Sequence, residues 1–346
     1  MHTPVETQKR SAFLSSASAA VGALGFGVLL SKPAVADNQT LRVSMAAQTV
    51  IYAPYLIAIE KGYYNQERLT LDITMAGGGV ATPAQIAGKI DINTSGPVAL
   101  TPILRGSPLK IVYTEATHPV YQLWSTSKDI KTLQDLKGKQ IGIISRGDTF
   151  ELSMKMALVK AGLPLDYVSY TALGNGSALG PAFAAKSLPG FILSTQDIEQ
   201  ARHIGALAQG NLIVNMIKDT PMPYSGIAVT EAFIKDHADA LRGFLRATMK
   251  GSRYMRKFKA QTLAVVGKYN PSIDSSVSSA DYDVTMPLLT KDGTVADDVL
   301  RAYLEVQAQV LGLPKEQIPP VSRAWDYTLV REANAGLDKT RWQPTA

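Results

Sequence analysis

From residue 40 to residue 230, short runs of apolar residues alternate with stretches whose apolar positions recur at helical spacing. This alternation is typical of α/β units built on largely parallel sheets. Runs bounded by glycine, proline or polar residues predict buried strands. The predicted strands are residues 41–45, 71–75, 90–93, 110–114, 123–125, 140–144, 167–172, 191–194 and 227–230. The pattern therefore predicts two α/β regions in succession.

The predicted helices have start and stop signals of their own. Thr82-Pro83 caps and begins one helix, and Gly62 and Gly162 close two others. The main predicted helices are residues 54–63, 82–87, 149–161, 231–258, 263–268, 297–310 and 325–335. The last third has no strong strand, so we expect it to be helical packing. No low-complexity linker divides the two α/β regions, so a continuous-chain hinge is expected between them.

The first 36 residues have the order of an export signal. Lys9-Arg10 precede an apolar run at 12–30, and Ala34-Val35-Ala36 supplies a small-x-small cleavage site. The alternative is a membrane anchor, but the serines and glycines in the run make a poor permanent membrane helix. The Lys-Arg pair only partly matches a twin-arginine signal, so the export route stays open. We expect cleavage after Ala36 and a mature protein outside the cytoplasm.

The composition excludes several classes of site and partner. The 346 residues include no cysteine, which excludes disulfides, thiolate metal sites, iron–sulfur clusters and a lipid-modified cysteine. Loss of residues 1–36 lowers the net charge from +6 to +4, because three basic residues and one acidic residue are removed. A surplus that small does not indicate nucleic-acid binding. The basic residues that bunch at 242–259 are interpreted as a solvated helix face, with an anionic partner as the less favoured alternative.

Residues for common catalytic chemistry are sparse. Beyond residue 36 the histidines are His118, His203 and His237, and no HExxH or His/carboxylate cluster predicts a metal site. The motifs GxSxG and GxxxxGK[ST] are absent as well. A glycine pattern at 174–180 follows a predicted strand, but its GxGxxxG spacing makes dinucleotide binding the less favoured interpretation. The sequence predicts neither a cofactor nor a metal.

Four loops between a predicted strand and a predicted helix are rich in glycine and hydroxyl residues, at 77–79, 95–96, 145–149 and 174–177. A helix N-terminus offers free N–H groups and a positive dipole. Ligands of open α/β sheets bind at the carboxyl ends of the strands. Each loop alone is an ordinary βα turn, but together they predict one binding site where the two regions face each other.

Several segments, taken in order, carry a family resemblance. They are YAPYLIAIEKGYY at 52–64, LDI at 71–73, the glycines 77–79, GKIDI at 88–92 and LQDLKGKQIG at 133–142. From about residue 40 to residue 260 the chain resembles the periplasmic solute-binding proteins of the nitrate/sulfonate/taurine ABC importers, a group that includes thiamine-pyrimidine-precursor binders. The segment LPGFI at 188–192 departs from the family's usual turn in the second domain.

This resemblance implies an α/β, two-lobed periplasmic-binding-protein fold of type II, with two mixed or parallel sheets flanked by helices and a hinge-lined cleft. It implies a cleaved signal at 1–36, a first lobe at 37–125, a second lobe at 126–230, and a return to the first lobe with C-terminal helices at 231–346. The implied function is a non-catalytic receptor that captures a small organic solute and delivers it to an ABC permease and its ATPase. The protein is expected to be a periplasmic monomer with no lipid anchor.

The resemblance also implies a set of ligand-facing residues. Tyr52 and Tyr121 would supply flat surfaces and hydroxyls, with core packing as an equal alternative. Arg146 would clamp a carboxylate or sulfonate, or else point to solvent. Asp148 and Glu115 favour an amine or a ring N–H instead, so a sulfonate, a carboxylate and a nitrogen heterocycle all stay open. The full set is Gln48, Tyr52, Gly77, Gly78, Gly79, Ser95, Glu115, His118, Tyr121, Arg146, Asp148, Thr149, Asn175, Gly176, Ser194 and Thr195.

Two other functions are open to a chain with this resemblance. Enzymes of the same fold synthesise the thiamine pyrimidine, but they resemble a cysteine-rich, iron-associated and intracellular pattern that a chain without cysteine does not supply. A sensory input receptor with this fold would act on a kinase in place of a permease.

Overall fold

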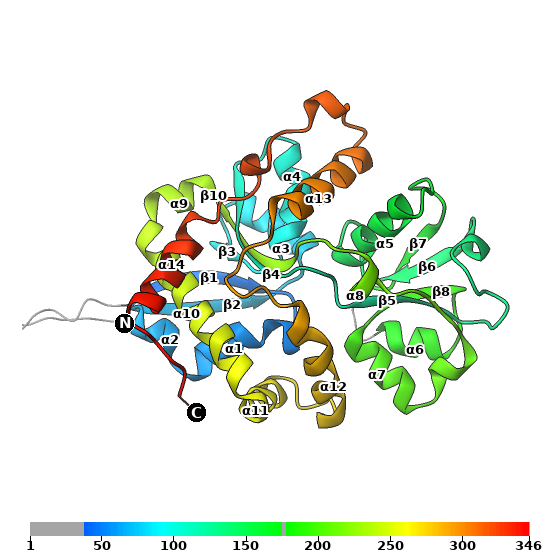
Figure 1. Ribbon diagram of the computed structural model, residues 1–346, viewed down its shortest axis with the longest axis horizontal. Coiled ribbons are helices and arrows are strands. Elements are labelled where there is room, and N and C mark those ends of the chain that lie inside the picture. The colour runs from blue at the N-terminus through cyan, green and yellow to red at the C-terminus, as the bar shows by residue number, and fades with distance from the viewer. Residues whose placement is uncertain (1–37, 175–177, 346) are drawn as a thin grey trace, which may run out of the picture. The chain divides into compact units, whose positions relative to one another are not determined.

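The computed structural model describes residues 38–174 and 178–345, which form two α/β lobes (Figure 1). The expected export signal and the predicted ligand residues Asn175 and Gly176 lie outside these ranges. The first lobe holds a five-stranded sheet in the order β2-β1-β3-β10-β4. Its strands are β1 Gln39–Met45, β2 Leu69–Met75, β3 Ile92–Asn93, β4 Leu109–Ala116 and β10 Tyr224–Thr230. The apolar residues of β1 and β4 are buried, as the apolar runs predict.

The second lobe repeats the arrangement with five strands in the order β7-β6-β8-β5-β9. These strands are β5 Tyr121–Ser125, β6 Gln140–Ile143, β7 Ser169–Ala172, β8 Gly190–Ser194 and β9 Leu212–Val214. In each sheet four strands run in the same direction, and one antiparallel strand, β10 or β5, is inserted next to the edge strand β4 or β9. Both sheets are therefore mixed, which confirms the predicted fold class.

Strand membership differs from the predicted lobe boundaries. The lobe boundaries implied by the family resemblance place residues 123–125 in the first lobe and 227–230 in the second. In the structure β5 pairs with β8 and β9, and β10 pairs with β3 and β4. An apolar run predicts a strand but does not identify its partner, because pairing joins residues far apart in sequence. The chain therefore passes between the sheets twice, at residues 117–120 and again just before β10.

Helices cover both sheets. They are α1 Ala53–Glu60, α2 Tyr63–Gln66, α3 Gly78–Ile86, α4 Leu100–Leu104, α5 Thr149–Lys160, α6 Leu179–Ala184, α7 Thr195–His203, α8 Met216–Asp219, α9 Glu231–Asp236, α10 Ala238–Lys257, α11 Lys259–Tyr269, α12 Ser275–Thr285, α13 Asp297–Val310 and α14 Thr328–Lys339. Short 3₁₀ turns include η1 Val50–Tyr52, η2 Gly96–Ala99 and η3 Gln134–Leu136. Within the described ranges, no helix combines the length and apolar character needed to cross a membrane.

The long helix α10 is the centre of packing in the first lobe, where it lies between α1 and α14 (Figure 1). Gly251 permits the close crossing with α1, because a Cβ at this position would lie 2.0 Å from the Pro54 carbonyl oxygen. The apolar side of α10, which includes Phe244 and Leu245, is fully buried.

The basic residues of α10 are not a free solvated face. Arg246 pairs with Glu67 after α2, and Lys250 lies 3.6 Å from the same carboxylate. Arg253 pairs with Asp338 of α14 at 2.7 Å, and Arg242 pairs with Glu332 at 2.8 Å. The solvated-face interpretation is therefore corrected: these cations bind carboxylates on neighbouring elements and fasten α10 to them.

Candidate functional site

Tyr121, at the first position of β5, joins both lobes through its hydroxyl. That hydroxyl lies 2.8 Å from Thr149 Oγ1 at the start of α5 and 2.9 Å from the hydroxyl of Tyr224 on β10. The Tyr121 ring stacks on Phe150 with centroids 4.0 Å apart, and it meets the Tyr224 ring edge-on at 5.3 Å. The structure therefore brings together the predicted ligand residues Tyr121 and Thr149, and it adds Tyr224 and Phe150.

Tyr52 supplies the matching surface from the first lobe. It lies in η1, directly before α1, and is 7% exposed. Burial raises the pKa of the Tyr52 phenol to about 12, while the nearby hydroxyls of Ser225 and Ser95 act in the opposite direction. Tyr52, Ser95 and Ser225 thus form a buried cluster of hydroxyls beside Tyr121 and Tyr224.

The predicted glycine loop at 77–79 is the beginning of α3. Gly77 is the N-cap, and Gly78 and Gly79 are the first two helical residues. Gly78 must lack a side chain, because a Cβ would lie 2.8 Å from Val98 Cβ and 2.9 Å from Ser95 Cβ. A Cβ at Gly79 would lie 4.0 Å from Ser145 Oγ of the second lobe. The glycines therefore bring the N-terminus of α3 close to Ser95 and to the opposite lobe.

Asp281 of α12 is a buried carboxylate at the contact between the lobes. Its Oδ1 accepts hydrogen bonds from the hydroxyl of Thr195, at the start of α7, and from Thr285 Oγ1 at 3.2 Å. Burial raises the pKa of Asp281 to about 6, and these two hydroxyls together with the Val50 backbone N–H oppose the rise. Asp281 therefore connects η1 of the first lobe to α7 of the second.

Two predicted ligand residues instead cap helices. Asp148 accepts hydrogen bonds from the N–H groups of Phe150 and Glu151, both at 3.0 Å, and of Ser145 at 2.7 Å. Burial raises the pKa of Asp148 to about 6 against these bonds. Ser194 forms a capping box with Asp197 at the start of α7. The N-termini of α5 and α7 are thus occupied by side chains of the chain itself.

Arg146 and Glu115 form their direct contacts with residues other than the site tyrosines. Arg146 Nε lies 3.1 Å from Glu151 Oε2, and its guanidinium lies over the ring of Tyr170. The Arg146 side chain is 60% exposed. Glu115 is 1% exposed inside the first lobe and accepts a 3.0 Å hydrogen bond from the Tyr113 hydroxyl. Burial raises the pKa of Glu115 to about 8.

Gln48 and His118 are half-buried in loops that precede η1 and follow β4. His118 Nδ1 lies 3.1 Å from Thr117 Oγ1, and burial together with Lys160 lowers its pKa. Within residues 38–174 and 178–345, no group of three or more His, Asp or Glu side chains is placed to hold a metal ion.

Sequence reasoning missed Tyr224, Ser225 and Asp281. Tyr224, Ser225 and Gly226 open β10 but precede the predicted strand at 227–230, so they were not considered for the site. Asp281 lies in a helix that the pattern did not predict. The apolar residues Val277, Ala280 and Val284, spaced three and four positions apart, were the available signal for that helix.

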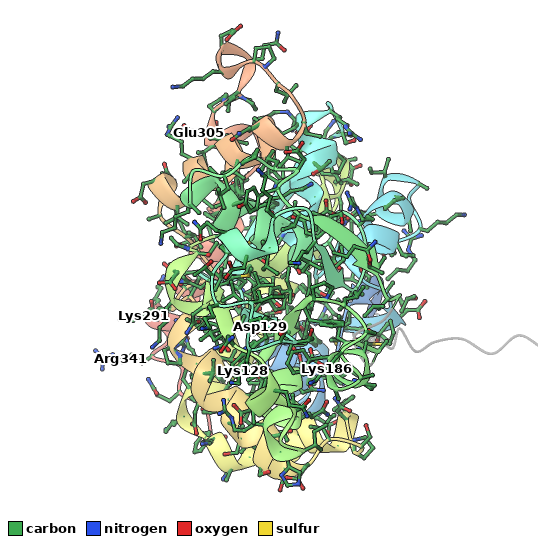
Figure 2. All side chains as sticks on the ribbon, turned by 90° about the vertical axis from the view of Figure 1, so that its right-hand side faces the viewer. Lys128, Asp129, Lys186, Lys291, Glu305 and Arg341 are labelled. Atoms are coloured by element: carbon green, nitrogen blue, oxygen red, sulfur yellow. The ribbon has the colours of Figure 1, made fainter. Side chains whose placement is uncertain are left out.

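A surface hollow of about 450 Å³ lies elsewhere, at the C-terminal end of α13. It is lined by Glu305, Gln309, Gly312, Leu313, Pro314, Lys315 and Ile318, and Figure 2 labels Glu305 on this helix. None of the predicted site residues lines it.

Solved structures share this fold. The alkanesulfonate-binding protein SsuA from Xanthomonas axonopodis pv. citri, bound to MOPS, matches with a TM-score of 0.66 and 16% identity over 86% of this chain and 98% of that one. The periplasmic nitrate-binding protein NrtA from Synechocystis matches with a TM-score of 0.70 and 14% identity over 89% of this chain and 92% of that one. At these identities the likeness shows the fold alone, which is that of periplasmic binding proteins.

Two curated relatives match at the level of sequence. The riboflavin-binding protein RibY of Chloroflexus aurantiacus is 26% identical over 230 residues, which cover 63% of this chain. The 4-amino-5-hydroxymethyl-2-methylpyrimidine phosphate synthase of Schizosaccharomyces pombe is 25% identical over 228 residues, which cover 62% of this chain. The chain spans 64% of the length of each relative.

The family resemblance drawn from the ordered segments is confirmed by a family model. The model described as NMT1/THI5 like matches residues 50–259, which is more than half of the chain. The matched range contains Tyr52, Ser95, Tyr121, Thr149 and Tyr224. The chain therefore belongs to the NMT1/THI5-like family.

Proposed function

We propose that the chain is an extracytoplasmic solute-binding receptor of an ABC importer, which holds a small organic solute between its two lobes. The observation that carries the proposal is the cluster of tyrosines and hydroxyl side chains at the contact between the lobes. Tyr121 and Thr149 come from the second lobe, and Tyr224 and Tyr52 come from the first. Aromatic faces with a few fixed polar groups are typical of small-molecule sites.

The two segments in which the chain crosses between the lobes would serve as the hinge that such a receptor needs. The chain crosses between the lobes at 117–120 and again just before β10, and Tyr121 and Tyr224 lie directly beside these crossings. Hinge closure is carried by a few residues at the ends of elements. A solute that contacts both tyrosines would therefore favour the closed arrangement, and its binding free energy would drive closure.

The relatives support solute capture without selecting one solute. Their names refer to riboflavin, alkanesulfonate and nitrate, which differ in size and charge. We propose an ABC permease and its ATPase as partners, with residues 1–36 as the export signal and the periplasm as the location. Of the predicted ligand residues, Gly77, Gly78, Gly79, Ser95 and Thr195 stay in the proposed site with Tyr52, Tyr121 and Thr149.

A second candidate is an enzyme, because one relative is named as a pyrimidine phosphate synthase. The receptor is preferred because the side chains at the site are hydroxyls, aromatic rings and one carboxylate. That carboxylate, Asp281, accepts hydrogen bonds from three donors of the chain itself. Detectable turnover, or iron bound in stoichiometric amount, would favour the enzyme. A partner kinase identified by co-purification would favour a sensory receptor.

The test is a thermal-shift panel of small solutes on residues 37–346, followed by calorimetry on each solute that raises the melting temperature. We expect Tyr121→Phe to weaken binding by about tenfold, because one hydroxyl at the site is lost. The matched control is Tyr167→Phe, since Tyr167 donates to the Gln134 carbonyl in the same lobe but outside the site. The proposal is contradicted if no solute binds, or if both variants bind as the parent does.

A further inference from the structure

A buried carboxylate, Asp281, lies close enough to Tyr224 of the proposed site to act on its pKa. Asp281 is 5% exposed and lies where η1, α7 and α12 meet. The Thr195 and Thr285 hydroxyls share its Oδ1, and the Val50 N–H is a third donor. A carboxylate offers about four acceptor positions. Asp281 therefore keeps acceptor capacity for a further N–H or O–H donor.

Two helix N-termini beside the proposed site, those of α5 and α7, are already occupied by side chains, whereas that of α3 has no side-chain cap. Asp148 accepts from two N–H groups at the start of α5. The side chains of Ser194 and Asp197 form the capping box at the start of α7. Each carboxylate places a negative charge at the positive end of a helix dipole, where a ligand anion would otherwise be favoured. An anionic solute would meet these charges and would not find free donors at α5 and α7.

No cation balances Asp281 among the described contacts of the site. The side-chain hydrogen bonds of Tyr121, Tyr224 and Thr195 end on hydroxyls or on Asp281 itself. Arg146, which was predicted to clamp a carboxylate or sulfonate, pairs with Glu151. A buried carboxylate without a cationic partner disfavours a second anion and favours a proton donor.

A second observation indicates that this surface awaits a ligand. Ser225 is 4% exposed, and its Oγ has no hydrogen bond of good geometry, although it lies beside the Tyr52 phenol. Ser225 also has a φ of 53°, a left-handed conformation that costs a non-glycine residue free energy. Such strain persists at ligand sites, where the surrounding structure enforces it. The unpartnered Ser225 hydroxyl belongs to the same cluster of buried hydroxyls as Tyr52 and Ser95.

We propose that Asp281 determines charge specificity: it accepts a hydrogen bond from a neutral or cationic solute that carries an N–H donor, and it excludes oxyanions. This inference rests on the proposed receptor function and adds the class of solute to it. On opening, the Thr195 hydroxyl leaves Asp281, and the solute donor takes its place or binds beside it. Ser225 Oγ and the tyrosine hydroxyls then contact the remaining polar atoms of the solute.

Calorimetric titration with benzamidine, benzamide and benzoate tests the inference, because these probes share one shape and differ in charge and donors. Wild type should bind benzamidine or benzamide at least about tenfold more tightly than benzoate. Asp281→Asn should reduce that preference by about tenfold, since the negative charge is removed while an acceptor oxygen is kept. The control is Asp283→Asn on the same helix, because Asp283 is exposed and pairs with Lys259. It should leave the preference unchanged.

The outcomes separate the two proposals. Equal or tighter binding of benzoate, nitrate or MOPS by wild type overturns the charge inference and leaves the receptor function standing. An unchanged preference in a folded Asp281→Asn variant also overturns it. The wild-type comparison needs no variant, so a variant that fails to fold does not remove the test. If wild type binds none of these probes and no solute of the wider panel, the receptor function and the charge inference both fail.

Discussion

Glu115 is the residue whose surroundings give the clearest dependence of stability on pH. It is 1% exposed, and burial raises its pKa from 4.5 to about 8, with Tyr113 and Arg256 opposing the rise. The folded chain therefore holds a proton that the unfolded chain releases between about pH 4.5 and about pH 8. Stability from this group is fully present below that window and is lost as the pH rises through it.

Glu115→Gln should remove this dependence. The variant should gain stability over wild type by about 1.4 kcal/mol per pH unit across the window, because one proton is no longer linked to folding. Denaturant unfolding at several pH values measures the difference. Glu305→Gln on exposed α13 is the control and should follow wild type. Parallel pH profiles for Glu115→Gln and wild type would contradict the account.

At the residue scale, the sequence predicted some of the residues that lie in the proposed site. Tyr121 and Thr149 were expected and hydrogen-bond each other. Arg146 and Glu115 were expected too, but their side chains are engaged by Glu151 and Tyr113. Sequence position places a residue in a loop, whereas the direction of its side chain depends on partners distant in sequence. Asp281, which lies 86 residues from Thr195, illustrates the point because only folding brings the two together.

At the element scale, the crossing of α10 with α1 is set by Gly251. We expect Gly251→Ala to destabilise the chain by about 3 kcal/mol, because its Cβ would lie 2.0 Å from the Pro54 carbonyl oxygen. The matched control is Gly267→Ala in α11, where nothing lies within 4 Å. It should stabilise by up to about 1 kcal/mol through helix propensity. Chemical denaturation compares the two, and equal effects would contradict the packing described for Gly251.

The strength of local signals decided which elements were predictable. Residues 297–310 match α13, whose apolar positions recur at helical spacing. The predicted loop at 77–79 belongs to α3, because a glycine start gives no helix signal of its own. The predicted helix at 231–258 is divided at His237 into α9 and α10.

At the scale of the whole molecule, the two-sheet α/β fold was predictable from local alternation and from the ordered segments. The exchange of β5 and β10 between the sheets was not, because an apolar run predicts a strand but does not identify the strands that it pairs with. The exchange matters for function. It places Tyr121 and Tyr224 beside the two crossings, so closure of the lobes and contact with a solute are the same event in the proposed receptor.

The most direct test of solute capture between the lobes is a distance measured across them. The chain has no cysteine, so spin labels at Lys89→Cys and Lys137→Cys would be unique. Both positions are exposed, the first in the first lobe and the second before β6. Labels at Lys89→Cys and Lys339→Cys, both in the first lobe, provide the control.

Double electron–electron resonance should then be recorded with and without a solute that raises the melting temperature. The account predicts that the solute shifts the distance between the lobes to one shorter, narrower population and leaves the control pair unchanged. A distribution between the lobes that stays the same while the solute is bound in stoichiometric amount would contradict it.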